Sequence, residues 1–283
     1  MTNDPLRDQV RATLKQLHAS PQKLMGQNFL CNPDVVRRIA AVRRLSGEDI
    51  LLEVGPGLGA LTEELAATGA SLTGLELDGD LAAYLQAKFI MNENVRIFNT
   101  DALRFDYEAF AGGRPFRLYA NVPYSITTPL LKKLFTSGGN WQSLTLMLQQ
   151  EAALRVVEGR GRGNGPLTLL ARYYGECSLL FDVPPDRFWP IPKVYSAVIN
   201  IERRQEPPVA GDIRYIMRLV EAGFAERRKL LLNSLAAAEG GSKDYWRQGL
   251  LACGLPDSVR AEQLDLIDFA RLNDWHQHNK KTS

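Results

Sequence analysis

The sequence predicts an α/β protein in which a mostly parallel sheet is followed by a small, all-helical C-terminal part. Between Asp49 and about Glu151, short apolar runs alternate with helical stretches, which is typical of a parallel sheet. Between Asp212 and Trp275, apolar residues instead recur every three to four positions, as in a helical bundle. We therefore expect two domains, residues 1–204 and 205–283, joined at the proline-containing segment Gln205-Glu206-Pro207-Pro208.

The first part of the chain, from about residue 5 to 45, has the pattern of amphipathic helices with a glycine-containing connection. Asn32 followed by Pro33 predicts a helix N-cap with proline at the first helical position. On this pattern alone, Phe29 and Leu30 are interpreted as a hydrophobic staple in front of that helix.

A glycine turn follows the first predicted strand. The strand-like run Asp49–Val54 leads into Gly55-Pro56-Gly57-Leu58-Gly59 and then into a helical stretch from Ala60. Glycine has no Cβ and tolerates positive φ, so the backbone of such a turn can approach a nucleotide-like ligand closely. The spacing Gly55-x-Gly57-x-x-Ala60 also satisfies the dinucleotide fingerprint, which keeps a hydride-transfer enzyme among the alternatives.

Acidic residues follow the next two predicted strands. The run Ser71–Leu75 ends in Glu76, about 20 residues after the glycines, where an acid can bind both hydroxyls of a ribose. The run Val95–Phe98 is followed by Asp101, which suits the amine of a bound adenine. The carboxyl ends of parallel strands meet at one edge of a sheet, so we expect these groups to lie close together.

A fourth run, Phe116–Ala120, ends in Asn121-Val122-Pro123-Tyr124. The Asn side-chain oxygen and a backbone carbonyl of this tetrapeptide can both accept hydrogen bonds from one NH₂ group, and Tyr124 offers a ring on which a flat base can stack. A strand-ending turn explains the same residues equally well when they are taken alone. With the glycine turn, Glu76 and Asp101 beside it, the motif favours an S-adenosylmethionine site and an amine clamp, because it has no task in a nicotinamide enzyme. A purely structural glycine turn ranks third.

The composition is that of an ordinary globular protein. The chain has 283 residues, is 45% hydrophobic and carries a formal net charge of +2, which does not by itself indicate a nucleic-acid partner. The three cysteines are far apart and lack a ligand spacing, so we expect neither a disulfide framework nor a metal site. There is no signal pattern at Met1 and no run of 18 apolar residues, so we expect a cytoplasmic protein without a membrane partner. Nothing in the sequence requires more than a monomer.

Together these motifs, in their order and spacing, resemble the ribosomal RNA adenine dimethyltransferases, and most of all the group that modifies bacterial small-subunit (16S) rRNA. The resemblance extends over nearly the whole chain. It is carried by the segments Gly26–Leu30, Leu52–Thr62, Glu76–Asp78, Asp101–Leu103, Asn121–Tyr124, Gln149–Glu151, Val183–Val194, Phe224–Asn233 and Arg260–Leu264.

The resemblance implies a Rossmann-like class I S-adenosylmethionine-dependent methyltransferase sheet and a C-terminal helical domain that binds RNA. The implied reaction is dimethylation of the 6-amino groups of two adjacent adenosines in a hairpin loop near the 3′ end of 16S rRNA. The implied substrate is an immature 30S particle, late in small-subunit biogenesis. S-adenosylmethionine is the implied methyl donor, without a metal.

Carried over position by position, the resemblance implies two groups of site residues. The implied cofactor-binding residues are Asn28, Leu30, Gly55, Gly57, Glu76, Asp101 and Asn121. The implied catalytic residues, which hold and stack the target adenine, are Asn121, Pro123, Tyr124 and Phe188. The resemblance also implies that the segment before Pro33 folds over the cofactor, which is the alternative to a hydrophobic staple.

Two positions depart from the family's pattern, and three other functions remain open. Ser125 stands where the family often has Asn or His, and Gln150 where a basic residue is common, so the resemblance implies no RNA contact at these two positions. The alternatives are a DNA adenine methyltransferase, a large-subunit rRNA methyltransferase of the macrolide-resistance type, and a non-catalytic assembly factor on the same fold.

Overall fold

The computed structural model describes residues 5–17, 28–122, 126–159, 164–226 and 228–279. These residues form two compact units. The first comprises the N-terminal part through Ala153 together with Cys177–Arg203, and the second comprises Leu154–Glu176 together with the chain from Arg204 onward. The stretch Leu154–Glu176 thus groups with the C-terminal helices, although it precedes the domain boundary expected after residue 204. None of the described helices is long and apolar enough to cross a bilayer.

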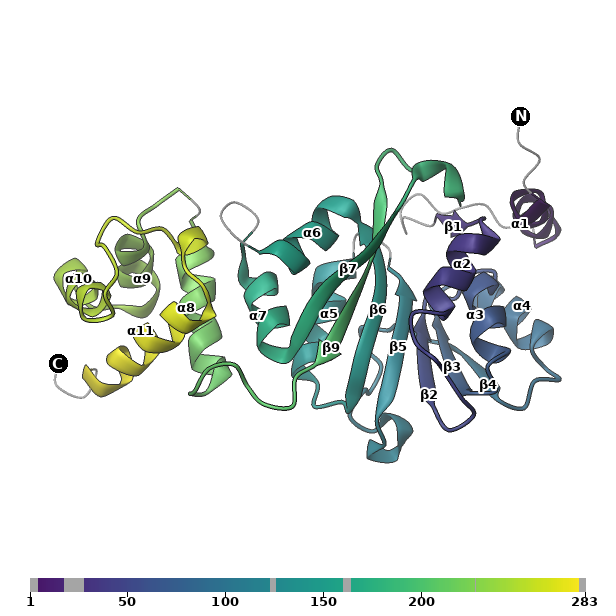
Figure 1. Ribbon diagram of the computed structural model, residues 1–283, viewed down its shortest axis with the longest axis horizontal. Helices are drawn as coiled ribbons and strands as arrows, with labels where there is room; N and C mark the ends of the chain where they lie inside the picture. The colour runs from purple at the N-terminus through teal and green to yellow at the C-terminus, as the bar shows by residue number, and fades with distance from the viewer. Residues whose placement is uncertain (1–4, 18–27, 123–125, 160–163, 227, 280–283) are drawn as a thin grey trace. The chain divides into compact units, whose positions relative to one another are not determined.

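A seven-stranded sheet forms the centre of the first unit, with the strand order β4-β3-β2-β5-β6-β9-β7 (Figure 1). Its strands are β2 (Ile50–Val54), β3 (Ser71–Glu76), β4 (Val95–Asn99), β5 (Phe116–Asn121), β6 (Trp141–Gln149), β7 (Gly175–Val183) and β9 (Ser196–Arg203). The pairs β2–β3, β3–β4, β2–β5 and β5–β6 are parallel, and β6–β9 is antiparallel. The predicted mostly parallel sheet is therefore confirmed.

Helices precede and connect these strands. They are α1 (Pro5–Gln16), α2 (Pro33–Ala40), α3 (Ala60–Ala66), α4 (Gly79–Lys88), α5 (Thr127–Thr136) and α6 (Gln150–Glu158), the last of which extends into the second unit, with short 3₁₀ turns at Phe110–Gly113 and Pro185–Arg187. The predicted N-cap is present, because the Asn32 side chain accepts a hydrogen bond from the Val35 amide at 3.0 Å and Pro33 opens α2.

The strand order reverses between β2 and β5. From β2 the chain crosses through α3 to β3 on one side, and from β5 it crosses through α5 to β6 on the other. Because parallel crossovers are right-handed, α3 and α5 belong on opposite faces of the sheet. Ligands of open α/β sheets bind at such a switch point, outside the carboxyl ends of the strands.

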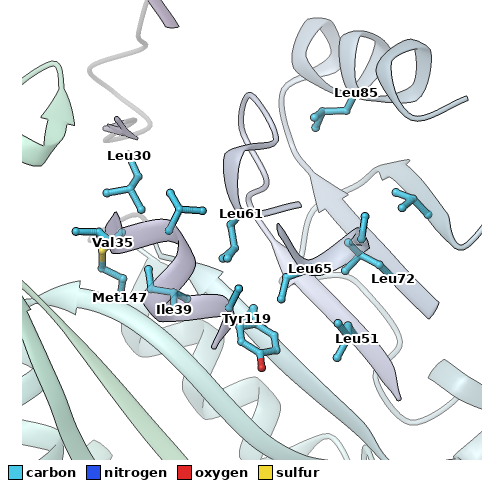
Figure 2. Close-up of a cluster of buried hydrophobic side chains, with 14 of the residues drawn as sticks. Leu30, Val35, Ile39, Leu51, Leu61, Leu65, Leu72, Leu85, Tyr119 and Met147 are labelled. Atoms are coloured by element: carbon cyan, nitrogen blue, oxygen red, sulfur yellow. The ribbon is translucent and has the colours of Figure 1, made fainter. Parts of the chain in front are cut away.

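A core of aliphatic side chains fixes α2, α3 and α4 on one face of the sheet (Figure 2). Val35 and Ile39 of α2, Leu61 and Leu65 of α3 and Leu85 of α4 pack there with the strand residues Leu51, Leu72, Tyr119 and Met147. Burying one such aliphatic side chain stabilises the fold by about 1.5–3 kcal/mol. The helices α2, α3 and α4 are therefore held firmly against the strands.

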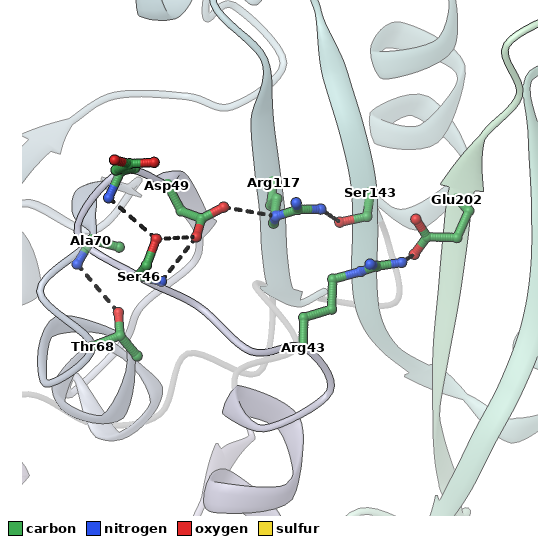
Figure 3. A network of polar contacts seen from close by, with 9 residues as sticks. Arg43, Ser46, Asp49, Thr68, Ala70, Arg117, Ser143 and Glu202 are labelled. Carbon is green, nitrogen blue, oxygen red and sulfur yellow. Dashed lines mark hydrogen bonds and ion pairs between the residues drawn. The ribbon is translucent and has the colours of Figure 1, made fainter.

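A polar network joins the opposite, amino-terminal edge of the sheet (Figure 3). The Arg117 guanidinium on β5 donates to Asp49 Oδ1 at 3.1 Å and to Ser143 Oγ on β6 at 3.4 Å. Arg43, which follows α2, forms an ion pair with Glu202 on β9. Arg43 therefore serves the packing of the fold.

A second sheet has only two strands, β1 (Phe29–Leu30) and β8 (Phe188–Trp189), which pair antiparallel with Leu30 opposite Phe188. Phe29 and Leu30 thus form a strand in front of α2, and Leu30 also packs in one buried cluster with Val35 and Ile39 of α2. The Cys31 amide also donates to the Arg187 carbonyl at 2.7 Å, which extends this link between segments far apart in the sequence.

The second unit is helical apart from the start of β7. It contains α7 (Pro166–Tyr174), α8 (Ile213–Phe224), α9 (Leu231–Glu239), α10 (Lys243–Ala252), a 3₁₀ turn at Ala261–Gln263 and α11 (Leu266–Asn279). Trp246, Leu235 and Phe269 are fully buried in it. The Asn164 side chain, also buried, donates to the Leu264 carbonyl and thereby connects the loop before α7 to the C-terminal helices.

Candidate active site

A cavity of about 340 Å³ opens at the carboxyl ends of β2, β3 and β5, at the switch point of the sheet. This volume lies in the usual range for small-ligand sites. Eight of the ten predicted site residues line it. These are Asn28, Leu30, Gly55, Gly57, Glu76, Asp101, Asn121 and Phe188. The other two, Pro123 and Tyr124, lie outside the described residues, as does Ser125, which departs from the family's pattern.

The glycine turn forms the floor of the cavity, and its backbone requires glycine. Gly55, Gly57 and Gly59 have φ values of +70°, +61° and +84°. A Cβ on Gly57 would lie 3.3 Å from the Phe29 ring, and one on Gly59 would lie 2.8 Å from Leu85 Cδ2. The turn can therefore approach a ligand with bare backbone, as its sequence predicts.

Glu76, at the end of β3, fixes the shape of this turn. Its Oε2 accepts from the Gly57 amide at 2.9 Å and its Oε1 accepts from the Asp78 amide at 3.0 Å. The side chain is only 5% exposed, and burial raises the pKa of its carboxyl, although the two backbone donors counteract the shift. Each carboxylate oxygen has two lone pairs, so both can still accept a hydrogen bond from a vicinal diol such as ribose.

Glu53, at the end of β2, is a second buried acid on the cavity wall. Its Oε2 accepts from the Thr62 hydroxyl at 2.7 Å. Burial, together with the nearby Glu76 charge, raises the pKa of Glu53 to about 8. In the sequence Glu53 lies two residues before the first glycine, but only the fold reveals that its carboxyl is desolvated beside another acid.

The loop after β4 carries Asp101 and is held by several hydrogen bonds. Asp101 Oδ1 accepts from the Leu103 amide at 2.8 Å. The Tyr107 hydroxyl donates to the Ala102 carbonyl at 3.0 Å, and the Lys133 ammonium of α5 donates to the Leu103 carbonyl at 2.7 Å. The loop is therefore preorganised, and Asp101 lines the cavity from its start.

Asn121, the last residue of β5, connects the strand end to the N-terminal segment. Its Nδ2 donates to the Asn28 carbonyl at 3.1 Å. This bond orients the amide group, and the atom that can accept a hydrogen bond from a ligand is then Oδ1. An acceptor oxygen at this strand end is what an amine clamp needs.

Phe188 is one of two phenylalanines in the cavity wall, together with Phe29. It is 1% exposed and is held on β8 opposite Leu30. Trp189, next to it, packs with Phe29 and with Val10 and Leu14 of α1, and Val10 itself lines the cavity. Residues of α1 and β1 thus form part of the cavity wall.

Several apolar residues of the cavity wall were not among the predicted site residues. They are Ile39, Leu77, Leu103, Ile126 and Met147. Leu77 directly follows Glu76, and Leu103 lies two residues after Asp101, so closeness in sequence to the predicted acids was the available signal for these two. Met147 comes from β6 and is brought to Asn121 only by strand pairing.

Several basic side chains that could serve as phosphate contacts have partners within the protein. Arg37 pairs with Asp34, Arg38 lies over the Phe181 ring, and Arg204 pairs with Glu176. Lys229 pairs with Glu226 at 2.7 Å. For these residues the structural role is the simpler explanation.

Comparison with known proteins identifies the family. The family model "Ribosomal RNA adenine dimethylase" matches residues 19–275. The chain belongs to this family. It is 39% identical over 254 residues to "Ribosomal RNA small subunit methyltransferase A" of Methylococcus capsulatus, with 89% of this chain and 96% of the relative covered. It is 37% identical over 270 residues to the protein of the same name from Geobacillus kaustophilus, with 92% of both covered.

Solved structures agree with the fold. The 23S rRNA methyltransferase ErmE has 26% sequence identity and a TM-score of 0.69, covering 88% of this chain and 99% of its own. A dimethyladenosine transferase from Plasmodium falciparum has 22% sequence identity and a TM-score of 0.73, with 88% of this chain and 96% of that chain covered. At this identity the match shows that the two proteins share a fold. The predicted methyltransferase sheet and the predicted family are confirmed, and both support S-adenosylmethionine as the methyl donor.

Proposed function

We propose that this dimethylase acts on small-subunit rRNA, transferring methyl groups to the 6-amino groups of two adjacent adenosines. The proposed site is a hairpin loop near the 3′ end of 16S rRNA in an immature 30S particle, late in small-subunit biogenesis, and the enzyme works as a cytoplasmic monomer. The substrate assignment is supported by relatives named for the small subunit that cover about nine-tenths of this chain.

The observation that carries the chemistry is the position of Asn121. Its side chain lines the same cavity as Glu76 and Asp101, with its amide nitrogen engaged by Asn28. In the proposal, Asn121 Oδ1 accepts an N–H of the target adenine and stabilises the positive charge that develops as the nitrogen attacks. The Pro123 carbonyl would accept the second N–H, and Tyr124 and Phe188 would stack the base.

The remaining residues have binding roles in the proposal. S-adenosylmethionine supplies a methyl group on a positively charged sulfur. Glu76 accepts the ribose hydroxyls, Asp101 accepts from the adenine amine of the cofactor, and Gly55 and Gly57 permit close backbone approach. Asn28 and Leu30 cover the cofactor and exclude water. A paired adenine cannot reach such a cavity, so the target must be unpaired or flipped out.

The helical residues 205–283 are proposed to bind RNA, and the methyltransferase part to be residues 1–204. This domain assignment is supported by the helical character of the second unit. If this assignment is right, replacing an exposed cation of the helical domain such as Arg228 should lower affinity for the particle and leave cofactor binding unchanged.

One assay tests the substrate. Labelled S-adenosylmethionine is offered with undermethylated small subunits, mature small subunits, large subunits or DNA. Label confined to undermethylated small subunits and mapped as dimethyladenosine is the expected result. Transfer only to large subunits would favour the macrolide-resistance type of activity, a second candidate supported by the 26% identity to ErmE, and transfer only to DNA would contradict both.

A variant tests the clamp. Asn121→Ala should abolish methyl transfer, because the acceptor for the amine is lost, while cofactor affinity measured by calorimetry falls only modestly. Asn140→Ala is the matched control, since Asn140 is exposed and bonds the Gly113 carbonyl at the other end of the sheet. Near-normal turnover of Asn121→Ala would contradict the assigned role.

A further inference from the structure

The connection between β8 and β9 exposes several large apolar side chains. This segment, the 190–195 loop, comprises Pro190, Ile191, Pro192, Lys193, Val194 and Tyr195. Ile191 is 59% exposed, Val194 44% and Tyr195 50%. Single exposed apolar residues are normal at a protein surface, but three within five positions form a patch that calls for a partner.

Both ends of the 190–195 loop are fixed at the carboxyl edge of the sheet. Before it, Phe188 lines the cavity and pairs with Leu30. After it, the Tyr195 carbonyl accepts from the Gln150 amide at 3.0 Å, which continues the pairing of Gln149 with Ser196. The Asn121–Met147 pair lies two residues earlier along β6, so Tyr195 stands at the edge where Asn121 ends β5.

The composition of the loop suits a flat, partly charged ligand. Two prolines restrict the backbone, so little conformational entropy is lost when a ligand binds. Exposed Lys193 lies between the apolar side chains and can face a phosphate. Three side chains are too few for a protein interface, which buries about 800 Å² on each partner.

We propose that the 190–195 loop is a docking surface for the unpaired nucleotide next to the target adenosine, with Tyr195 stacking on its base and Ile191 and Val194 contacting the base edge. The inference rests on the proposed function. A nucleotide flipped into the cavity deprives its neighbour of a stacking partner, and an aromatic ring at the same edge of the sheet replaces that partner. Because every base has a flat face, this contact positions the strand without selecting its sequence.

The test is the steady-state kinetics of methyl transfer to undermethylated small subunits. Stacking of one base contributes about 1–3 kcal/mol, so Tyr195→Ala should raise KM for the particle about 5- to 150-fold. It should leave kcat and the dissociation constant of S-adenosylmethionine near their wild-type values, because Tyr195 is outside the cavity lining. Tyr195→Phe keeps the ring and should restore the wild-type KM.

A second comparison separates apolar contact from general surface effects. Ile191→Ala should raise KM, whereas Ile90→Ala should not, since Ile90 is 78% exposed but lies after α4, next to the amino end of β4. The KM ratio of Tyr195→Ala to wild type should stay constant as salt rises, because stacking does not release counterions.

Two kinds of failure are distinguishable. If wild-type protein does not label undermethylated small subunits, the proposed function fails and the inference falls with it. If wild type is active but Tyr195→Ala has the KM of Ile90→Ala, or loses cofactor affinity, or is not rescued by phenylalanine, then the docking surface alone is refuted.

Discussion

Replacement of Glu53 by glutamine should make the stability of the protein less sensitive to pH. Glu53 is buried at 2% exposure, and its pKa is raised from 4.5 to about 8. As the pH rises above 4.5, the unfolded chain releases this proton while the folded protein keeps it. The contribution of Glu53 to the free energy of unfolding is therefore fully present below about pH 4.5 and is lost as the pH rises through about 8.

The size of the effect follows from the shift. At 1.36 kcal/mol per unit, the rise from 4.5 to about 8 corresponds to about 5 kcal/mol at most. Glu53→Gln removes the titration but keeps an oxygen that accepts the Thr62 hydroxyl. The variant should match wild type near pH 4.5 and exceed its free energy of unfolding by several kcal/mol at pH 8.

Urea unfolding at pH 5, 6, 7 and 8, followed by far-ultraviolet circular dichroism, measures this difference. Glu48→Gln is the matched control, because it removes a carboxylate at an exposed position just before β2. A difference between Glu53→Gln and wild type that is the same at pH 5 and pH 8 would show that the folded protein does not hold the Glu53 proton, and would refute the reasoning.

Two further predictions concern the glycine turn and the second unit. Glu76→Gln places an amide N–H where a carboxylate oxygen now accepts a backbone N–H, so affinity for S-adenosylmethionine should fall by about 1–3 kcal/mol, measured by calorimetry, and unchanged affinity would contradict the role of Glu76. Gly223→Ala puts a Cβ 2.7 Å from Leu231 Cδ1 between α8 and α9, and should lower the free energy of unfolding by about 1–3 kcal/mol in urea titrations. A stabilised Gly223→Ala protein would show instead that helix propensity outweighs the crowding there.

Local sequence predicts much of the first unit because its signals are short-range. A polar residue directly after an apolar run marks the end of a strand, and this rule located Glu76 and Asn121 within one residue of the observed ends of β3 and β5. Asn32 and Pro33 likewise specify the start of α2 through contacts within four residues. The cavity residues are mostly strand ends, which explains why eight of the ten expected ones meet in one place.

The sequence by itself determined the strand ends, the glycine turn and the resemblance to the family, since each depends on neighbouring residues. Tertiary structure decided the rest, because it depends on residues far apart along the chain. The β1–β8 pairing joins Leu30 to Phe188 and makes both part of the cavity wall. Only burial beside Glu76 gives Glu53 its raised pKa, and only the sheet brings the exposed ring of Tyr195 to the edge where Asn121 ends β5.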